Sequence, residues 1–356
     1  AILFTSLILL ATALPLSKHS HWLVRSMDFP RVQICIASLM LLLAQCSMFS
    51  NLAGIYGLLI LVTSACLIWQ LSWVLPYTAF WPKEVSNSQG ATLDTQLCIL
   101  TSNVLTPNRK VGALIDLVAK HEPDILVTLE SDQWWEDNLR PVEKQMPYSI
   151  KCPLDNLYGM HVYSRLALDE GEICFLVEDD VPSIHVSIQL RSGDRVRAHF
   201  LHPAPPSPTE NVESKQRDAE LVVVARSVSK SQQPVIVTGD LNDVGWSATT
   251  RLFRKISGLL DPRIGRGMFN TFHAGNPLLR WPLDHIFHSA DFTLVSLQRL
   301  PSIGSDHFPL LTRLNLEAQP MQQSSGLHLS DVEEDWASEI EQRQDVNEDQ
   351  VPKPNE

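Results

Sequence analysis

The sequence predicts an α/β domain of about 220 residues that follows a set of transmembrane helices. Long apolar stretches fill the first 82 residues, and from Gln96 onward short β-branched runs alternate with segments of helical apolar spacing. Several of these runs end in a polar residue. The expected organisation is a membrane region over 1–82, a linker over 83–95, the α/β domain over 96–316 and a tail over 317–356.

The membrane region contains three apolar stretches, residues 2–17, 33–55 and 57–79, and the last two lack Asp, Glu, Lys and Arg. Each of these two exceeds the roughly 20 residues that span a bilayer core. A signal peptide would explain only the first stretch, and buried helices of a soluble protein are the alternative for the other two. Aromatic residues near the end of the third stretch resemble an interfacial belt: Trp69, Trp73, Tyr77 and Trp81. We expect three transmembrane helices.

The orientation of these helices follows from charge. Lys18, Arg25 and Arg31 lie between the first and second stretches, which favours a cytoplasmic loop and, after three spans, a cytoplasmic domain. The sequence opens at Ala1 without a methionine, so we expect further residues upstream, whose charge could reverse the orientation. The expected location is a bacterial inner membrane.

Charge and cysteine content exclude several classes of function. The net charge is -12, and residues 317–356 alone hold eleven acidic and two basic residues. This acidic tail is poor in apolar residues and is expected to be disordered. The domain has no clustered basic surface of the kind that binds duplex nucleic acid. The six cysteines form no C-x-x-C pair, so neither a zinc site nor a disulfide framework is expected.

Within the domain, we expect one helix over 111–120, which Pro123 ends, and a second over 209–229. The expected strands are short and rich in Val, Ile and Leu. They cover residues 97–100, 124–129, 161–163, 184–189, 195–201, 235–237, 282–288 and 308–314.

The strand at 235–237 ends in Gly239-Asp240-Leu241-Asn242. Because side chains alternate along a strand, Asp240 and Asn242 would lie on the same side of the extended chain. A carboxylate and a carboxamide at a strand end suit a base and a positioning group. The alternative is an ordinary turn stabilised by Asx hydrogen bonds.

Other strand ends and loops carry matching polar residues in six short motifs. These are T-S-N-V-L at 101–105, D-I-L-V-T-L-E at 124–130, F-L-H-P-A-P-P at 200–206, V-T-G-D-L-N-D at 237–243, P-L-D-H-I-F at 282–287 and G-S-D-H-F-P at 304–309. Together and in this order, they resemble the endonuclease/exonuclease/phosphatase superfamily of DNase I-like proteins, as a membrane-anchored bacterial-type member. The resemblance covers residues 96–316 and implies a four-layered α/β sandwich with two packed, mainly antiparallel sheets.

The resemblance also implies a metal site. Glu130 would be the principal ligand of a divalent cation, with Asn103 and Asp306 beside it. Mg²⁺ is expected, with Mn²⁺ as the alternative, because Mg²⁺ binds few carboxylates and keeps several waters. The alternative for Glu130 is a solvated acid at a strand end.

The catalytic residues follow by the same resemblance. Asp240 would orient or deprotonate the attacking water, and Asn242 would hold the phosphate or the nucleophile. His307 would act as general base or phosphate contact, with Asp284 fixing its tautomer.

His202 would donate a hydrogen bond to a phosphate oxygen, and His199 is the competing histidine of the same segment. His285 is expected to be structural. Three further residues are candidates for substrate binding, each with a structural alternative: Tyr158, Trp246 and Arg280.

The sequence therefore predicts a membrane-anchored, metal-dependent hydrolase of phosphate esters, with a nuclease as the first substrate class. A phospholipid, sphingomyelin or inositol-phosphate phosphoesterase is the alternative, and it would meet its substrate at the bilayer surface. A membrane-tethered binding protein without activity is disfavoured, because Glu130, Asp240 and His307 are all present. A transporter is disfavoured because the apolar stretches lack ionisable residues. The expected partners are the substrate and the bilayer, with no obligate protein partner.

Overall fold

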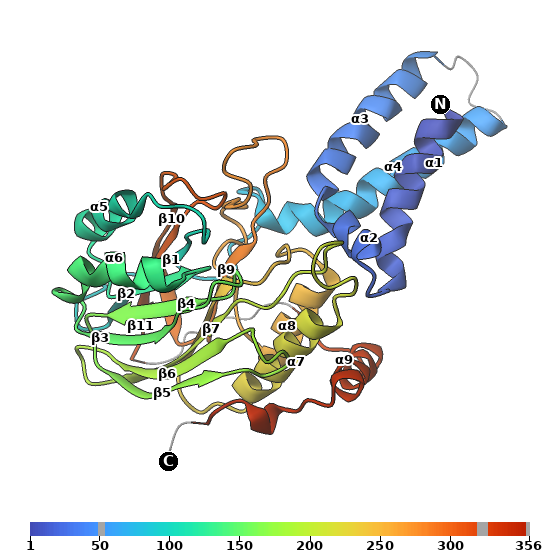
Figure 1. Cartoon of the computed structure of the whole chain (residues 1–356). Coiled ribbons are helices and arrows are strands. Elements are labelled where there is room, and N and C mark those ends of the chain that lie inside the picture. Colours follow the sequence, from blue (N-terminus) through green and yellow to red (C-terminus); the bar gives the residue numbers. More distant parts are fainter. Residues whose placement is uncertain (49–53, 319–326, 354–356) are drawn as a thin grey trace.

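The computed structural model describes residues 1–48, 54–318 and 327–353. Within these residues, two mixed β-sheets pack face to face, and helices cover both outer faces (Figure 1). The predicted α/β class is confirmed.

The first sheet has the strand order β10-β11-β1-β2-β4-β3. β1 and β2 run parallel, and the other neighbours pair antiparallel. Its strands are β1 (Gln96–Asn103), β2 (Ile125–Leu129), β3 (Tyr148–Cys152), β4 (Met160–Ser164), β10 (Phe292–Arg299) and β11 (Leu310–Leu316).

The second sheet has the order β5-β6-β7-β8-β9, in which β7 and β8 run parallel. The remaining pairs are antiparallel. Its strands are β5 (Leu168–Cys174), β6 (Ser183–Gln189), β7 (Arg195–Leu201), β8 (Val235–Asp240) and β9 (Asp284–His288).

Three apolar cores hold the layers together. The central core lies between the sheets and takes Ile99 and Val127 from the first and Val186 and Ile236 from the second. A second core packs α7 (Lys215–Ser229) and α8 (Ala248–Ser257) on the second sheet. A third packs α5 (Val111–His121) and α6 (Gln133–Glu143) on the first sheet. Removal of these side chains from water is the main driving force for this arrangement.

The expected strands and the helix over 111–120 are found close to their predicted bounds. The helix expected over 209–229 begins only at Lys215. The preceding residues pair with the N-terminal region instead, since Trp22 N–H donates to Val212 O at 2.9 Å and Ser214 N–H donates to Ser20 O at 2.8 Å. Five further elements of the α/β domain were not expected: α6, α8, β3, β5 and β10.

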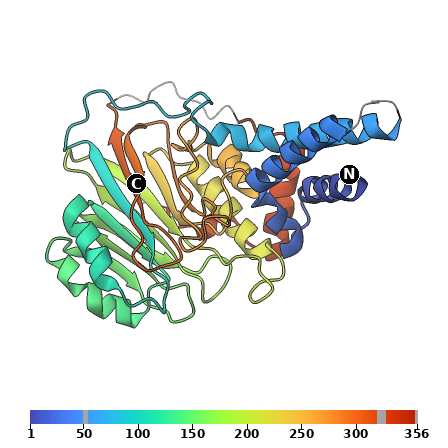
Figure 2. The same cartoon turned by 90° about the horizontal axis from the view of Figure 1, so that it is seen from above.

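The N-terminal region forms helices that project from the α/β domain to one side (Figures 1 and 2). They are α1 (Ile2–Ala13), α2 (Trp22–Arg25), α3 (Arg31–Met48) and α4 (Ile55–Val74), joined or extended by the short 3-10 turns Leu14–Ser17, Ser26–Asp28 and Leu75–Tyr77. Two of three expected spans are long and apolar enough to cross a bilayer, Arg31–Met48 and Ile55–Tyr77. The apolar helix before them, Ile2–Ser17, is shorter. The part of the second expected span over 49–53 lies outside the described residues.

The expectation of a disordered tail is wrong for residues 327–353. The tail contains α9 (Asp331–Gln344), capped by Ser330 and Glu333 and packed on α7 through Ala337 and Ile340. Some of its acidic residues pair with the domain, as Arg226 of α7 bonds Glu341 at 2.9 Å. Residues 319–326 and 354–356 of this tail lie outside the described residues.

The segment over 83–95 connects the N-terminal helices to β1 without a helix or strand element of its own, and it packs against the domain. Val85 is fully buried in the central core, and Glu84 forms a buried ion pair with Arg254 at 2.6 Å. The cost of removing each of these two charges from water is offset only while the partner charge is present. The segment therefore fixes the end of α4 against α8.

One glycine is required by the geometry that positions the site. Gly239 has φ +152°, and a Cβ there would lie 1.9 Å from the carbonyl oxygen of Leu201 in the adjacent strand β7. We expect Gly239→Ala to lower the free energy of unfolding by at least about 2 kcal/mol, because neither the strand nor the carbonyl can move away.

The matched control is Gly112→Ala in α5, where a Cβ meets nothing within 4 Å. That change should leave stability unchanged or raise it by up to about 1 kcal/mol. Thermal unfolding of the full chain in detergent would measure both. Equal midpoints for Gly239→Ala and the parent chain would contradict the assignment.

Candidate active site

The polar residues predicted at the strand ends meet at one end of the two sheets. Asp240 ends β8 directly opposite Asp284, the first residue of β9. Asn103 ends β1 opposite Leu129 of β2, so that Glu130 follows beside it. The sequence pattern of short strands ending in polar residues therefore produces one cluster drawn from both sheets.

His307 is the centre of this cluster. Its Nδ1 bonds Asp284 Oδ2 at 2.7 Å, and its Nε2 lies 3.4 Å from Asp240 Oδ2. All three side chains are buried. Burial alone would lower the pKa of His307, but the carboxylates of Asp284 and Asp240 outweigh it and raise the pKa to about 10. His307 is therefore a cation at neutral pH.

Asp240 has the opposite shift. Burial alone would raise its pKa, but His307 and the hydrogen bonds to its carboxylate lower it. Those bonds come from Asn242 N–H at 2.9 Å and Asn103 Nδ2 at 3.2 Å. Asp240 is thus an ionised carboxylate held in a fixed orientation.

Asn103 connects Asp240 to Glu130. Its Nδ2 also donates to Glu130 Oε1 at 2.7 Å, while its side-chain oxygen accepts from Leu105 N–H at 3.1 Å. Glu130 has φ +57°, in the left-handed region that non-glycine residues seldom adopt. Thr106 Oγ1 donates to Glu130 O at 2.8 Å and helps to hold this conformation. Strain of this kind, of order 1–3 kcal/mol, concentrates at functional sites.

The second carboxylate oxygen of Glu130 has no hydrogen-bond partner. Burial raises the pKa of Glu130 to about 7, against the lowering effect of Asn103. Among the described residues, Glu130 Oε2 and Asp284 Oδ1 are buried acceptors without a partner. Unsatisfied buried acceptors in an acidic cluster fit a bound cation.

The described residues contain one cluster whose ligand atoms all lie within 4.8 Å of one another, Asp240, Asp284 and His307. This cluster is a candidate divalent metal site. Within this cluster, His307 Nδ1 and Asp284 Oδ2 are already joined by a hydrogen bond.

His202 lies next to the cluster. Its Nε2 is 4.0 Å from Asp240 Oδ2, and its ring centroid is 5.3 Å from that of Tyr158. Burial lowers the pKa of His202 to about 4, so its imidazole is neutral at pH 7 and retains one N–H donor. The competing His199 instead bonds His185 at 2.7 Å and lies away from the cluster.

A pocket of about 560 Å³ opens over these residues. Of the residues singled out in the sequence, seven line it: Glu130, Tyr158, His202, Asp240, Asn242, Asp306 and His307. Asn103 and Asp284 are buried behind this surface and reach it through their hydrogen bonds. The side-chain nitrogen of Asn242 donates to Pro203 O at 3.1 Å, which fixes the loop after β7 beside the pocket.

Two residues predicted to bind substrate do not line this pocket. Trp246 is buried and donates from Nε1 to Asp28 O at 2.8 Å, so it anchors the N-terminal region. Arg280 is engaged by the carbonyls of His273 and Ala274, at 3.2 and 2.9 Å. His285 is structural, as expected: it contacts Arg263 at 2.6 Å and Asp243 O at 2.8 Å.

The sequence did not point to the part of the pocket that comes from outside the α/β domain. Met27, Phe29 and Pro30, just before α3, line its outer part together with Trp281. This part of the pocket depends on contacts between segments about 250 residues apart. The rings of Phe29 and Trp281, for example, lie 5.6 Å apart between centroids.

The role of Asp284 can be tested directly. In metal-free protein, we expect Asp284→Asn to lower the pKa of His307 by at least about 1 unit, because one of its two adjacent carboxylates is lost. Histidine-selective NMR titration of the full chain in detergent with EDTA would measure it. Asp169→Asn on β5 is the control and should leave the pKa of His307 unchanged. An equal pKa in Asp284→Asn and the parent would refute the coupling.

Comparison with known proteins places this geometry in a family. A family model described as "Endonuclease/Exonuclease/phosphatase family" matches residues 100–307. No curated protein sequence matches the chain.

Solved structures share its fold. D. rerio TDP2 complexed with single strand DNA product has a TM-score of 0.52 at 17% identity, covering 62% of this chain and 100% of that chain. An endonuclease/exonuclease/phosphatase from Bacteroides vulgatus has a TM-score of 0.51 at 18% identity, covering 63% and 100%. The human Nocturnin catalytic domain has a TM-score of 0.50 at 15% identity, covering 63% and 96%. The family match spans more than half of the sequence, and the chain belongs to the endonuclease/exonuclease/phosphatase family.

Proposed function

We propose that this chain is a metal-dependent hydrolase of phosphate esters, held at a bilayer by its N-terminal helices. The observation that carries the proposal is the continuous set of buried contacts from Glu130 through Asn103 and Asp240 to His307 and Asp284, beneath one pocket. Such a set provides an ionised acceptor, a cationic donor and an unsatisfied carboxylate within a few ångströms.

In this proposal, Asp240 accepts a proton from the attacking water, since its carboxylate is ionised and fixed by two donors. The cationic imidazole of His307 donates to a phosphate oxygen and stabilises the negative charge of the transition state. Asp284 is a positioning residue that holds the His307 ring. His202, neutral and buried, donates to another phosphate oxygen or to the leaving oxygen.

Glu130 is the preferred metal ligand, with Asp306 beside it at the pocket surface. A metal ion at the cluster of Asp240, Asp284 and His307 would have to replace the proton of His307 and its hydrogen bond to Asp284. The free Glu130 Oε2 has no such conflict. A Mg²⁺ or Mn²⁺ ion held there would neutralise phosphate charge and favour in-line displacement. Asn103 presents its amide nitrogen to Glu130, so in this arrangement it positions that carboxylate.

Membrane anchoring is supported by the surfaces of α3 and α4. Only 17% and 28% of their apolar windows are buried, unlike core helices of a soluble protein. Polar side chains instead face inward and link the helices: Gln45 bonds Thr5 at 2.9 Å, and Gln70 bonds Thr12 at 3.1 Å. Interhelical hydrogen bonds of this kind stabilise helix packing in lipid.

The prediction of a cytoplasmic catalytic domain depends on three cations, Lys18, Arg25 and Arg31. Arg25 is buried against Asp218 at 2.9 Å, and Arg31 is buried against Asp28. Two of the three cations behind the cytoplasmic prediction are thus neutralised within the protein, and only Lys18 still supports that orientation. The contact of Arg25 with Asp218 requires the segment before α3 and the catalytic domain to lie on the same side, as three spans would place them.

Two substrate classes suit this site chemistry, a nucleic acid and a lipid or inositol phosphate. One solved relative, D. rerio TDP2, is complexed with a single strand DNA product. The resemblance of the sequence places a nuclease first among the candidates and a lipid or inositol-phosphate phosphoesterase second. A catalytically silent binding protein is disfavoured by the intact set of Glu130, Asp240 and His307.

The metal mechanism predicts a large effect at Glu130. We expect Glu130→Ala to lower kcat/KM by about 10²–10³-fold on any phosphodiester that the chain hydrolyses, because the main ligand is lost. Assays of the full chain in detergent with Mg²⁺ would compare plasmid DNA, sphingomyelin and methyl p-nitrophenyl phosphate. Glu172→Ala, an exposed acid on β5, should retain full activity. Activity that persists in EDTA or in Glu130→Ala would reject the mechanism.

Membrane anchoring predicts the behaviour of the expressed full chain. It should sediment with membranes, stay there in alkaline carbonate, and enter the supernatant only with detergent, because the exposed faces of α3 and α4 are apolar. Immunoblotting of the fractions measures this. Recovery of the chain in the carbonate supernatant would show peripheral association instead.

A further inference from the structure

The pocket has two chemically different parts. Its floor is polar and consists of the proposed phosphate site: Glu130, His202, Asp240, Asn242, Asp306 and His307. Its outer part is apolar, with Met27 and Phe29 from the segment before α3 and Leu279 and Trp281 from the loop before β9. A substrate that fills the pocket therefore has a phosphate at one end and an apolar group at the other.

The outer part lies at the base of the apolar helices. Phe29 and Trp281 pack edge to face with ring centroids 5.6 Å apart, which joins the two walls. Gln33, in the first turns of α3, donates to Leu278 O at 2.8 Å. If α3 spans a bilayer, the mouth of the pocket lies at the lipid headgroup level.

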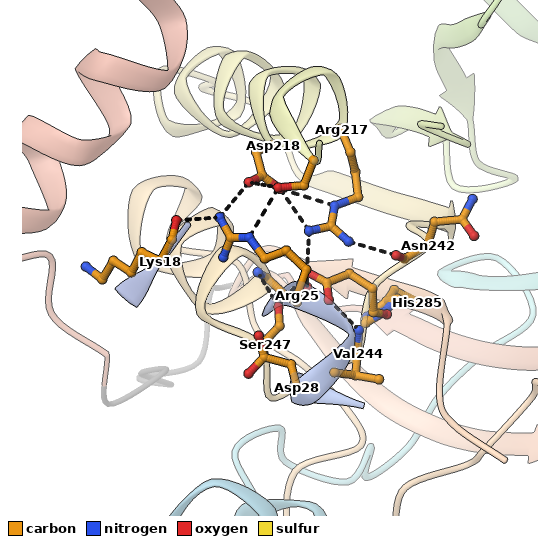
Figure 3. Close-up of polar contacts among 12 residues, drawn as sticks. Lys18, Arg25, Asp28, Arg217, Asp218, Asn242, Val244, Ser247 and His285 are labelled. Atoms are coloured by element: carbon orange, nitrogen blue, oxygen red, sulfur yellow. Dashed lines mark hydrogen bonds and ion pairs between the residues drawn. The ribbon is translucent and has the colours of Figure 1, made fainter. Parts of the chain in front are cut away.

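The segment with Met27 and Phe29, which forms the N-terminal wall of the pocket, is fixed to the loop that follows Asp240. Asp218 of α7 lies between Arg25 and Arg217 and bonds each at 2.9 Å (Figure 3). Arg217 in turn donates to Asn242 O at 2.9 Å. On the other side, Asp28 O accepts from Trp246 Nε1 at 2.8 Å. The apolar wall is thus held in a defined place relative to Asp240.

The charge of the pocket argues against a polyanion. Among the described residues that line it, none is Lys or Arg, and Glu210 adds an acid near its rim. Nucleic acids and inositol polyphosphates carry several phosphates, and proteins that bind them supply cations for the phosphates beyond the reacting one. Apart from His307 at the reacting phosphate, the nearby arginines are engaged within the protein. Arg25 and Arg217 are buried in ion pairs, and Arg280 bonds the carbonyls of His273 and Ala274.

The loop tip beside the pocket exposes apolar surface. Leu278 is 79% exposed and Leu279 49% exposed, next to α3. Exposed leucines at this position would reach the interfacial layer of a bilayer that contains α3 and α4.

From these features we propose that the pocket takes a membrane lipid with one phosphodiester. The phosphate lies on the polar floor, and an acyl chain lies along the apolar outer part that Met27, Phe29, Leu279 and Trp281 line. This proposal rests on the proposed function. In the reaction, water adds to phosphorus, the bond from phosphorus to one ester oxygen breaks, and that oxygen leaves protonated as an alcohol, with a phosphate monoester as the other product.

The test compares esters that differ only in their acyl chains. The full chain in nanodiscs with Mg²⁺ is assayed on vesicles of phosphatidylcholine, of phosphatidylglycerol and of sphingomyelin, and on glycerophosphocholine and glycerophosphoglycerol, which lack acyl chains. Methyl p-nitrophenyl phosphate and a single-stranded oligonucleotide complete the set. We expect kcat/KM to be at least about ten-fold higher on one acylated lipid than on its deacylated counterpart.

The wall is tested with Leu279→Glu, which places a charge in the path of the chain. It should lower the ratio of kcat/KM on the lipid to kcat/KM on methyl p-nitrophenyl phosphate by about ten-fold or more. Leu279 is half exposed, so the fold should tolerate the change, which circular dichroism checks. Val332→Glu on α9, at a residue 71% exposed, is the matched control and should leave both activities unchanged.

The outcomes separate the two proposals. Preference for the oligonucleotide, or equal rates on acylated and deacylated esters, overturns the lipid assignment. An equal loss on both esters in Leu279→Glu overturns the role of the wall. If the chain hydrolyses methyl p-nitrophenyl phosphate with Mg²⁺ but none of the lipids, the phosphoesterase proposal stands and the lipid proposal falls. If no ester is hydrolysed, both fall.

Discussion

The contact between His307 and its two carboxylates is the interaction on which the site depends. A buried cation is costly unless it is paired, and here Asp284 and Asp240 pair it from both ring nitrogens. Asp240 is oriented in turn by Asn103, which also orients Glu130. The charges of the site therefore support one another, and removal of any one of them leaves a neighbour buried without compensation.

The architecture explains how this pairing is reached. The two carboxylates beside His307 face each other across the β8–β9 ladder, while Asn103 and Glu130 come from the parallel pair β1 and β2 of the other sheet. The central apolar core presses the sheets together, and Thr101 and Thr238 make a hydrogen bond of 3.0 Å between them. Burial of apolar surface thus brings together the acidic groups that electrostatic repulsion would otherwise separate.

Much of this was accessible from the sequence. Strands that alternate with helices and end in polar residues predicted the α/β class, and the family resemblance of the six motifs indicated which residues converge. The signals failed where tertiary contacts decide the outcome. Trp246 looked like a loop residue near substrate. Its indole N–H instead donates to the backbone carbonyl of Asp28, more than 200 residues away. The acidic tail looked disordered, but the apolar face of α9, Ala337 and Ile340, finds its partner on α7. The apolar wall of Phe29 could not be predicted, because nothing local links it to the catalytic motifs.

The central claim is that Glu130 holds a divalent cation at a phosphoester site. Anomalous diffraction from crystals of the full chain grown with Mn²⁺ tests it most directly, because the scattering locates the ion without reference to any substrate. The account predicts a peak within ligand distance of the Glu130 carboxylate, near Asp306, and its absence in Glu130→Ala. A peak bound only between Asp284 and His307, or none at the pocket with saturating Mn²⁺, would contradict it.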